Sequence, residues 1–273
     1  MADRRTLAAV AVTLSLLTPA AADTPAIVAL DRRVRESSGL VASRRHDGVL
    51  WTHGDSGNPP VLFAVDRDGR ATHSFLVDAP NVDWEDMALA PGDGGDELLI
   101  ADTGNNRGGR DEVRVIVVAE PDFAAEPIGP IVPRRTLRLR YPPNVEPFDS
   151  EALFVLGEHG YLAAKIVGVP ASLYRFALDG DDAQILEPAG SLPIHLPVTG
   201  ADVSADGVTL AVSTIAGVYR IAVPHDGSPL ADQPTTFARH LDPRTEAVAC
   251  DGDDVVVTSE ANTMTRFAAS QFD

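Results

Sequence analysis

The sequence predicts an all-β fold, a five-bladed β-propeller, and the first observation behind this prediction is an internal repeat. A three-residue motif recurs ahead of five apolar strands, and its clearest copy is Glu85-Asp86-Met87. It consists of an acidic residue, which is Ser or Ala in two copies, then a small or acidic residue, and then an apolar residue. Successive copies are about 47, 66, 50 and 45 residues apart, which is the spacing of propeller blades. The copies begin at Ser38, Glu85, Glu151, Ala201 and Glu246.

The second and third observations concern the residues after each copy. A turn with glycine beside an acidic residue leads into a second apolar strand, as in a buried hairpin. These second strands are expected at residues 49–52, 98–101, 161–164, 209–212 and 255–258. After the first two of them, the loop is nearly the same tetrapeptide, Asp55-Ser-Gly-Asn58 and Asp102-Thr-Gly-Asn105. This duplication indicates a true internal repeat.

The two ends of the chain are expected to share one blade. Residues 26–30 and 33–35 read as a strand that has no blade before it, and residues 246–269 supply about three strands and then stop. Together they complete a fifth blade. Such an exchange between the termini closes the ring and removes free strand edges.

The second blade is the longest and leaves an alternative open. Its outer strands are expected at residues 113–118 and 136–140. Between them lies a Pro-rich region, residues 120–133, which could hold a degenerate extra blade. A six-bladed propeller is therefore the alternative to five blades.

Composition fits one globular domain, expected at residues 23–273. The chain of 273 residues is 44% hydrophobic and contains 22 glycines and 21 prolines, so it is turn-rich and large enough for one sizeable core. Its formal net charge of -18 argues against nucleic acid as a partner, because a phosphate backbone requires a basic surface. The charge fits better with a cation held among carboxylates, and we expect a monomer.

Residues 1–22 have the features of an export signal. Arg4 and Arg5 precede an apolar run at residues 7–17, and an Ala-x-Ala sequence ends at Ala22. The apolar run is too short for a stable membrane anchor. We therefore expect a secreted or periplasmic protein, in which the lone Cys250 cannot form an intramolecular disulfide.

The repeat places acidic residues at one mouth of the central channel. In a propeller the innermost strand of each blade lines the channel, so the residues at the strand starts converge there. These residues are Glu85, Glu151 and Glu246, with Ser38 and Ala201 in the other two blades. Clustered carboxylates repel one another unless a cation compensates them, and calcium prefers such oxygen ligands. We expect a calcium site formed by Ser38 and the three glutamates; the alternative is a solvated channel lining.

The ends of the second strands are expected to open onto the same face, with His53, Asp55, Asp102 and Lys165 in a ring above the glutamates. There His53, Asp55 or Asp102 could activate water. Lys165, the single lysine of the chain, could hold an anionic substrate. The alternative for both aspartates is an Asx turn, in which the side chain bonds its own backbone.

These motifs resemble two groups of propellers. The ring of one carboxylate per blade is similar to that of the calcium-activated nucleotidases (apyrases), which are five-bladed propellers with calcium in the channel. The sequences Glu-Ala-Leu at 151–153 and Thr-Gly-Ala-Asp-Val-Ser at 199–204 resemble secreted bacterial propellers of an esterase-like or phytase-like group. The first resemblance implies a channel calcium. This sequence departs from the apyrase pattern at Ala201, where a polar ligand is expected, and it shows no evident counterpart of the basic residues that hold a nucleotide in apyrases.

Two classes of function are open to this chain. The prediction is a calcium-containing scaffold that binds a small anionic ligand, a sugar or a partner protein at its top face. The alternative is a calcium-dependent hydrolase of phosphate esters or other esters, like phytases, nucleotidases or esterases. A propeller fold supports both, and the sequence identifies no paired nucleophile and base.

Overall fold

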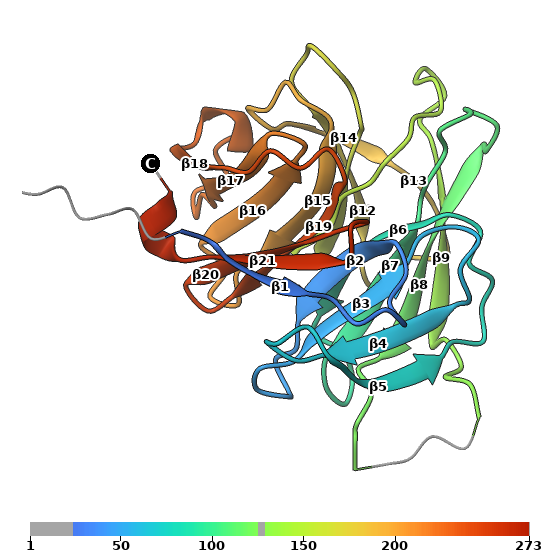
Figure 1. The fold of residues 1–273 in the computed structure, drawn as a ribbon. Coiled ribbons are helices and arrows are strands. Elements are labelled where there is room, and N and C mark those ends of the chain that lie inside the picture. Colours follow the sequence, from blue (N-terminus) through green and yellow to red (C-terminus); the bar gives the residue numbers. More distant parts are fainter. Residues whose placement is uncertain (1–23, 125–128, 273) are drawn as a thin grey trace, which may run out of the picture.

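The computed structural model describes residues 24–124 and 129–272. The export signal expected at residues 1–22 lies outside the described residues. Within them, twenty-one strands form five sheets arranged around a central axis (Figure 1). No helix of the described residues is long and apolar enough to cross a membrane. The predicted five-bladed β-propeller is confirmed.

Each blade is built on four antiparallel strands, with one further strand added to the sheet of blade 2, and the first strands of the five blades pack side by side around the axis. Blade 1 contains β2 (Ser37–Ala42), β3 (Leu50–Gly54), β4 (Val61–Val65) and β5 (Ala71–Leu76). Blade 2 contains β6 (Trp84–Ala90), β7 (Glu97–Asp102), β8 (Glu112–Ala119) and β9 (Arg135–Arg140). Blade 3 contains β10 (Leu153–Leu156), β11 (His159–Ala163), β12 (Ser172–Ala177) and β14 (Glu187–Ser191).

The remaining two blades complete the ring. Blade 4 contains β15 (Val198–Val203), β16 (Thr209–Thr214), β17 (Gly217–Ala222) and β18 (Thr235–Arg239). Blade 5 contains β19 (Thr245–Asp251), β20 (Asp254–Ser259), β21 (Thr263–Phe267) and β1 (Ala26–Ala29). Two short 3-10 helices lie outside the sheets, η1 (Leu230–Asp232) and η2 (Ala269–Gln271).

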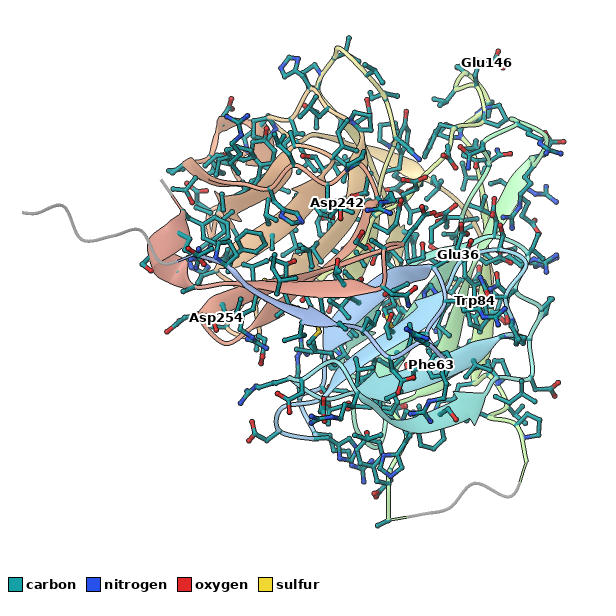
Figure 2. The ribbon with its side chains drawn as sticks, viewed as in Figure 1. Glu36, Phe63, Trp84, Glu146, Asp242 and Asp254 are labelled. Carbon is teal, nitrogen blue, oxygen red and sulfur yellow. The ribbon has the colours of Figure 1, made fainter. Side chains whose placement is uncertain are left out.

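Burial explains the sequence pattern of the strands. The inner strands β3 and β6 are buried at every position, because a neighbouring blade covers each face, so they show no alternation of apolar and polar residues; even His53 of β3 and Asp86 of β6 are buried. The outer strand β9 alternates instead, with Leu137 and Leu139 buried and Arg138 and Arg140 exposed. Figure 2 shows the same contrast, with Trp84 among the strands and Asp254 at the edge of the molecule.

The termini close the ring as predicted. β1 pairs with β21 in antiparallel register along its whole length, and the two lie side by side in Figure 1. Leu30 donates its N–H to the carbonyl of Asn262 at 2.8 Å, and the Asn262 side chain donates to the carbonyl of Val34 at 2.7 Å. The expectation that residues 33–35 continue the strand is wrong, because the chain turns after Leu30 and buries Val34 in the core.

The six-bladed alternative is wrong. The described residues of the 120–133 region form no blade of their own but run as a loop. Within it, Ile131 makes a single parallel bridge with Val77 at the end of blade 1. The extra length of blade 2 is therefore a connection between β8 and β9.

One strand was not predicted. β13 (Ala183–Ile185) pairs in parallel with β9 and so adds a fifth strand to the sheet of blade 2. The Gln184 side chain accepts the N–H of Ala177 and donates to its carbonyl, both at 2.9 Å, which fixes the approach to this strand. Three residues carry too little periodicity for a strand to be read from the sequence.

A buried carboxylate lies where the inner strands converge. Asp86 is fully buried, and its Oδ2 accepts the backbone N–H of Leu153 at 2.8 Å and that of Ala201 at 3.1 Å. Its Oδ1 accepts the N–H of Met87 at 2.8 Å. Burial raises the pKa of Asp86, and the three N–H donors oppose that shift. One side chain thus joins blades 2, 3 and 4.

Removal of β1 should open the ring. A variant that lacks residues 23–35 exposes the free edge of β21, so we expect aggregation and loss of a single cooperative unfolding transition. Size-exclusion chromatography and urea unfolding measure both properties. A soluble variant that unfolds as cooperatively as the wild type would contradict this account of closure.

Replacement of Asp86 should destabilise the core. Asp86→Ala leaves the buried N–H groups of Leu153 and Ala201 without an acceptor, at about 1 to 3 kcal/mol for each. We expect a loss of about 3 kcal/mol or more in urea unfolding, with a smaller loss for Asp86→Asn, whose amide keeps one acceptor oxygen. The control is Asp93→Ala on the exposed β6–β7 turn. Equal stability of the Asp86→Ala and Asp93→Ala variants would exclude the proposed role.

Candidate metal centre

β-Bulges decide which side chains reach the channel mouth. Four of the five inner strands contain an extra residue near their start, which shifts the pairing register there. A bulge leaves this residue unpaired and redirects its side chain. The extra residues are Ser38 in β2, Glu85 in β6, Thr199 in β15 and Glu246 in β19.

The bulges correct one alignment made from the sequence. Ala201 pairs with Val212 in the way that Met87 pairs with Ile100, so Ala201 lies two residues beyond the bulge. The residue equivalent to Glu85 in blade 4 is therefore Thr199, a buried threonine whose hydroxyl lies 3.1 Å from that of Ser213. The sequence pattern alone aligns Ala201 with Glu85, because Ala201-Asp202-Val203 matches Glu85-Asp86-Met87 in its aspartate and in the apolar residue that follows.

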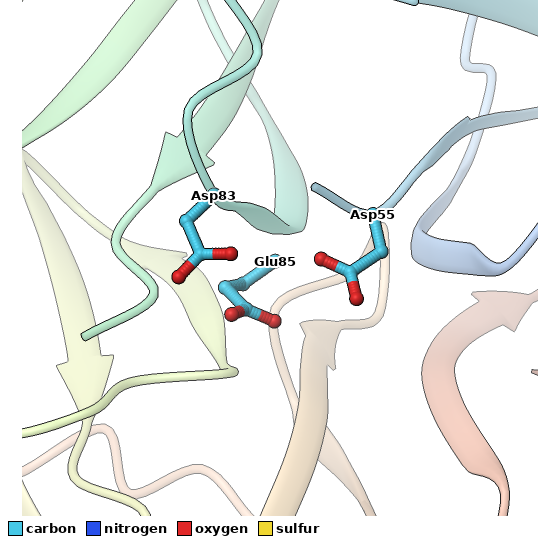
Figure 3. Close-up of side chains that lie close together, drawn as sticks. All are labelled: Asp55, Asp83 and Glu85. Atoms are coloured by element: carbon cyan, nitrogen blue, oxygen red, sulfur yellow. The ribbon is translucent and has the colours of Figure 1, made fainter. Parts of the chain in front are cut away.

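Three carboxylates face one another at the mouth (Figure 3). Asp55 follows β3, Asp83 precedes β6, and Glu85 is the bulge residue of β6; one oxygen from each lies within 4.8 Å of the others. Gly104 makes this approach possible, because a Cβ there would collide with the Asp83 and Glu85 carboxylates. The close approach of these carboxylates therefore requires glycine at position 104, in the second repeated tetrapeptide.

Glu85 is the least solvated of the three carboxylates. Only 4% of the residue is exposed, and no described residue donates a hydrogen bond to its carboxyl group. Burial first, and the charges of Glu151 and Asp55 after it, raise the pKa of Glu85 to about 10. Burial also raises the pKa of Asp55. Without a bound cation, protons must therefore occupy part of this cluster at neutral pH.

The other two predicted glutamates belong to a second group at the same mouth. Lys165 forms an ion pair with Glu151, and its Nζ lies 4.0 Å from Asp149 Oδ2. Burial outweighs the lysine and raises the pKa of Glu151 to about 7; burial and Glu151 together raise that of Glu246 to about 8. The charge of Lys165 is thus compensated within the mouth. Glu151 keeps one buried oxygen, Oε2, that makes no hydrogen bond to the described residues.

The predicted metal ligands are therefore divided between two groups. Glu85 lies in the three-carboxylate cluster, whereas Glu151 pairs with Lys165 and Glu246 lies near enough to Glu151 for the two charges to interact. Ser38 is buried at the start of β2, in the position equivalent to Glu85. The sequence missed Asp83, although its position two residues before Glu85 is a usable signal, since alternate residues of an extended chain point to the same side.

His53 is not in the ring of loop residues above the glutamates. It is fully buried in β3, and its ring nitrogens lie 3.3 Å from the Gly54 carbonyl oxygen and 3.4 Å from that of Asp86. The ring also packs edge-on against Trp84. Burial lowers its pKa to about 4, which is the behaviour of a neutral histidine in a core.

The two aspartates of the duplicated tetrapeptide occupy different positions. Asp102 is the last residue of β7 and pairs with Trp84, whereas in blade 1 the last strand residue is Gly54, so Asp55 lies one residue further on. Asp102 is fully buried, and its Oδ1 accepts hydrogen bonds from Arg110 and from the Asp83 backbone, both at 3.0 Å.

Asp102 therefore supports the site without facing it. Through Arg110, which also donates to the Gly104 carbonyl at 2.9 Å, it holds the loop beneath the carboxylate cluster. Burial raises the pKa of Asp102, and the Arg110 charge opposes the shift. Asp55 alone of the two reaches the channel, where its carboxylate also accepts a hydrogen bond from the N–H of the adjacent Ser56. An Asx turn would use the N–H two residues on, so the Asx alternative stays a prediction.

A cavity of about 550 Å³ opens beside the carboxylate cluster. It connects Asp83 and Gly104 to the surface, and the exposed Arg107 lines its outer part. Arg107 forms no ion pair or hydrogen bond with the described residues. A ligand in this cavity could therefore contact both the Asp83 carboxylate and the Arg107 guanidinium group.

Comparison with known proteins adds little to this geometry. No protein-family model matches the chain, and no curated protein sequence matches it. The chain is similar to the crystal structure of selenomethionine-substituted virginiamycin B lyase from Staphylococcus aureus, at 14% identity and a TM-score of 0.46 over 92% of this chain and 87% of that one. The resemblances to nucleotidases and to the esterase-like or phytase-like group stay predictions.

The stability of the metal-free protein should fall as pH rises. The pKa of Glu85 in the folded state, about 10, lies above the ordinary value of 4.5, so the folded state retains a proton that the unfolded chain loses in this window. We expect a decrease on the order of 1.4 kcal/mol per pH unit for each such group between about pH 5.5 and 8.5 in the presence of a chelator.

Urea unfolding across that range measures the slope. Glu85→Gln removes the titrating group and should flatten the slope by about one proton equivalent, whereas Asp93→Asn should leave it unchanged. Identical slopes for wild type and Glu85→Gln would show that Glu85 ionises normally in the fold.

Proposed function

We propose that this protein is an exported propeller that binds calcium at the channel mouth through Asp55, Asp83 and Glu85. The observation that supports the proposal most directly is the buried Glu85 carboxylate, which lies close to two other carboxylates and receives no hydrogen bond from the described residues. Removing such repulsion requires protons or a cation. A divalent cation would compensate all three groups at once.

The donor set fits calcium better than other metals. The three groups are hard carboxylate oxygens, and no histidine or cysteine joins the cluster among the described residues, which argues against zinc. Asp55 and Asp83 are half-exposed, so water or a ligand can complete a coordination shell of about six to eight oxygens. Magnesium demands stricter octahedral geometry than donors from two loops and one strand readily supply.

The proposed biological role is a binding scaffold. Asp55 extends from blade 1, and Asp83 and Glu85 belong to the start of blade 2, so the ion would join two neighbouring blades. The cavity beside Asp83 offers room for a small anionic ligand, a sugar or a loop of a partner protein. An anionic oxygen there could complete the coordination shell and contact Arg107.

Hydrolysis of phosphate or other esters stays a prediction from sequence resemblance alone. Two of the proposed catalytic groups are committed elsewhere, since Asp102 binds Arg110 and Lys165 binds Glu151. His53 is buried away from the cavity. The scaffold role therefore has the better structural support.

Calcium should stabilise the folded protein. An ion that binds only the folded state adds on the order of 2.7 kcal/mol at 100 times its dissociation constant, which raises the melting temperature by about 5 to 10 degrees for a chain of this size. Because the cluster holds protons when metal-free, calcium binding at about pH 7.5 should also release protons. Calorimetry in two buffers of different ionisation enthalpy measures that release.

Matched variants separate the site from general charge effects. Asp83→Asn and Glu85→Gln should shrink the calcium-dependent shift, and Asp93→Asn, which removes the same charge at the opposite end of β6, should not. A melting temperature that responds to neither calcium nor chelator, in protein proved metal-free by elemental analysis, would refute the proposal.

A further inference from the structure

A second cavity lies at the other end of the channel. Its volume is about 720 Å³, within the range of small-molecule binding sites. It begins where inner strands end, at Leu89 of β6, Leu156 of β10 and Val203 of β15, and it extends outward between blades 3 and 4. The acidic mouth lies at the starts of the same strands.

Part of the lining of this cavity is apolar. Leu156, Tyr161, Ala189, Val223 and Leu230 line it, and each packs against the core cluster between blades 3 and 4 while keeping part of its surface exposed. The Tyr161 ring is held flat against Phe154, with ring centroids 5.1 Å apart. Such a preformed apolar surface can bind an apolar molecule with little loss of side-chain freedom.

The charge of the lining is opposite to that of the protein. The chain contains 40 acidic residues, yet the lining contains none, and its two charged residues are Arg44 and Arg175. Arg175 pairs with the largely exposed Glu187 at 3.0 Å, a surface ion pair of small energetic value. Arg44 is exposed and forms no hydrogen bond or ion pair with the described residues.

We propose that this cavity binds an organic anion with an extended apolar body, such as a medium-chain carboxylate. The apolar body would lie on Tyr161 and Leu230, and the carboxylate would accept hydrogen bonds from Arg44. A cation would gain nothing from either arginine. This site shares no residue with the carboxylate cluster.

Titration calorimetry with decanoate tests the proposal, in buffer with a chelator so that the result does not depend on the metal centre. We expect one decanoate per protein and no measurable binding of acetate, which has the same charged group but no apolar body. Arg44→Ala should weaken decanoate binding about tenfold, the effect of losing one charge-assisted hydrogen bond. Ala189→Trp should abolish binding by filling the cavity.

Arg138→Ala is the matched control, because Arg138 is an exposed arginine of β9 outside the cavity and has no ion pair among the described residues. It should leave the affinity within about twofold of wild type. Melting temperatures verify that each variant is folded; Arg44 is exposed, so its replacement should not affect folding. The proposal fails if decanoate does not bind, or if the Arg44→Ala and Arg138→Ala variants bind it equally well.

Discussion

This propeller depends on supplying hydrogen-bond acceptors to the buried backbone N–H groups at the inner edges of its blades. The first strand of a blade has a partner on one side only, and its free edge faces the central axis, where Asp86 is fully buried. Buried N–H groups at such an edge need an acceptor. Asp86 provides it for Leu153 and Ala201, and Asp202 provides it for Cys250 at 2.8 Å. Two aspartates therefore connect blades 2 to 5 through the backbone.

The same constraint explains why one carboxylate at the axis is satisfied and its neighbour in sequence is not. Asp86 points inward and receives three backbone N–H groups, so the protein itself compensates its oxygens. Glu85 is displaced by the bulge to the mouth, where the described residues supply no donor and two more carboxylates approach. The proposed cation site thus follows from the direction in which the bulge turns the Glu85 side chain.

The fold could be predicted from the repeat because blade spacing and turn chemistry survive small errors of alignment. Side-chain positions do not tolerate such errors, since one residue of register moves a side chain to the other face of a strand. The sequence therefore aligned Ala201, and not Thr199, with Glu85. Asp55 and Asp102 stand in nearly identical tetrapeptides, yet only Asp55 faces the channel mouth. The pairing of Lys165 with Glu151 joins loops of one blade whose mutual position depends on tertiary packing. β13 depends on a partner strand far earlier in the chain, β9.

The Asp86 hydrogen bonds also determine how the two ends of the molecule relate. The bond from Ala201 to Asp86 links blade 4 to blade 2, which are not neighbours, and it lies between the acidic mouth and the arginine-lined cavity along β6. Any coupling between the ends would have to travel through the inner strands β6 and β15, which carry residues of both regions. These strands are hydrogen-bonded at Asp86 and buried almost throughout, which opposes the second arrangement that such coupling requires. We therefore expect the two sites to bind their ligands independently.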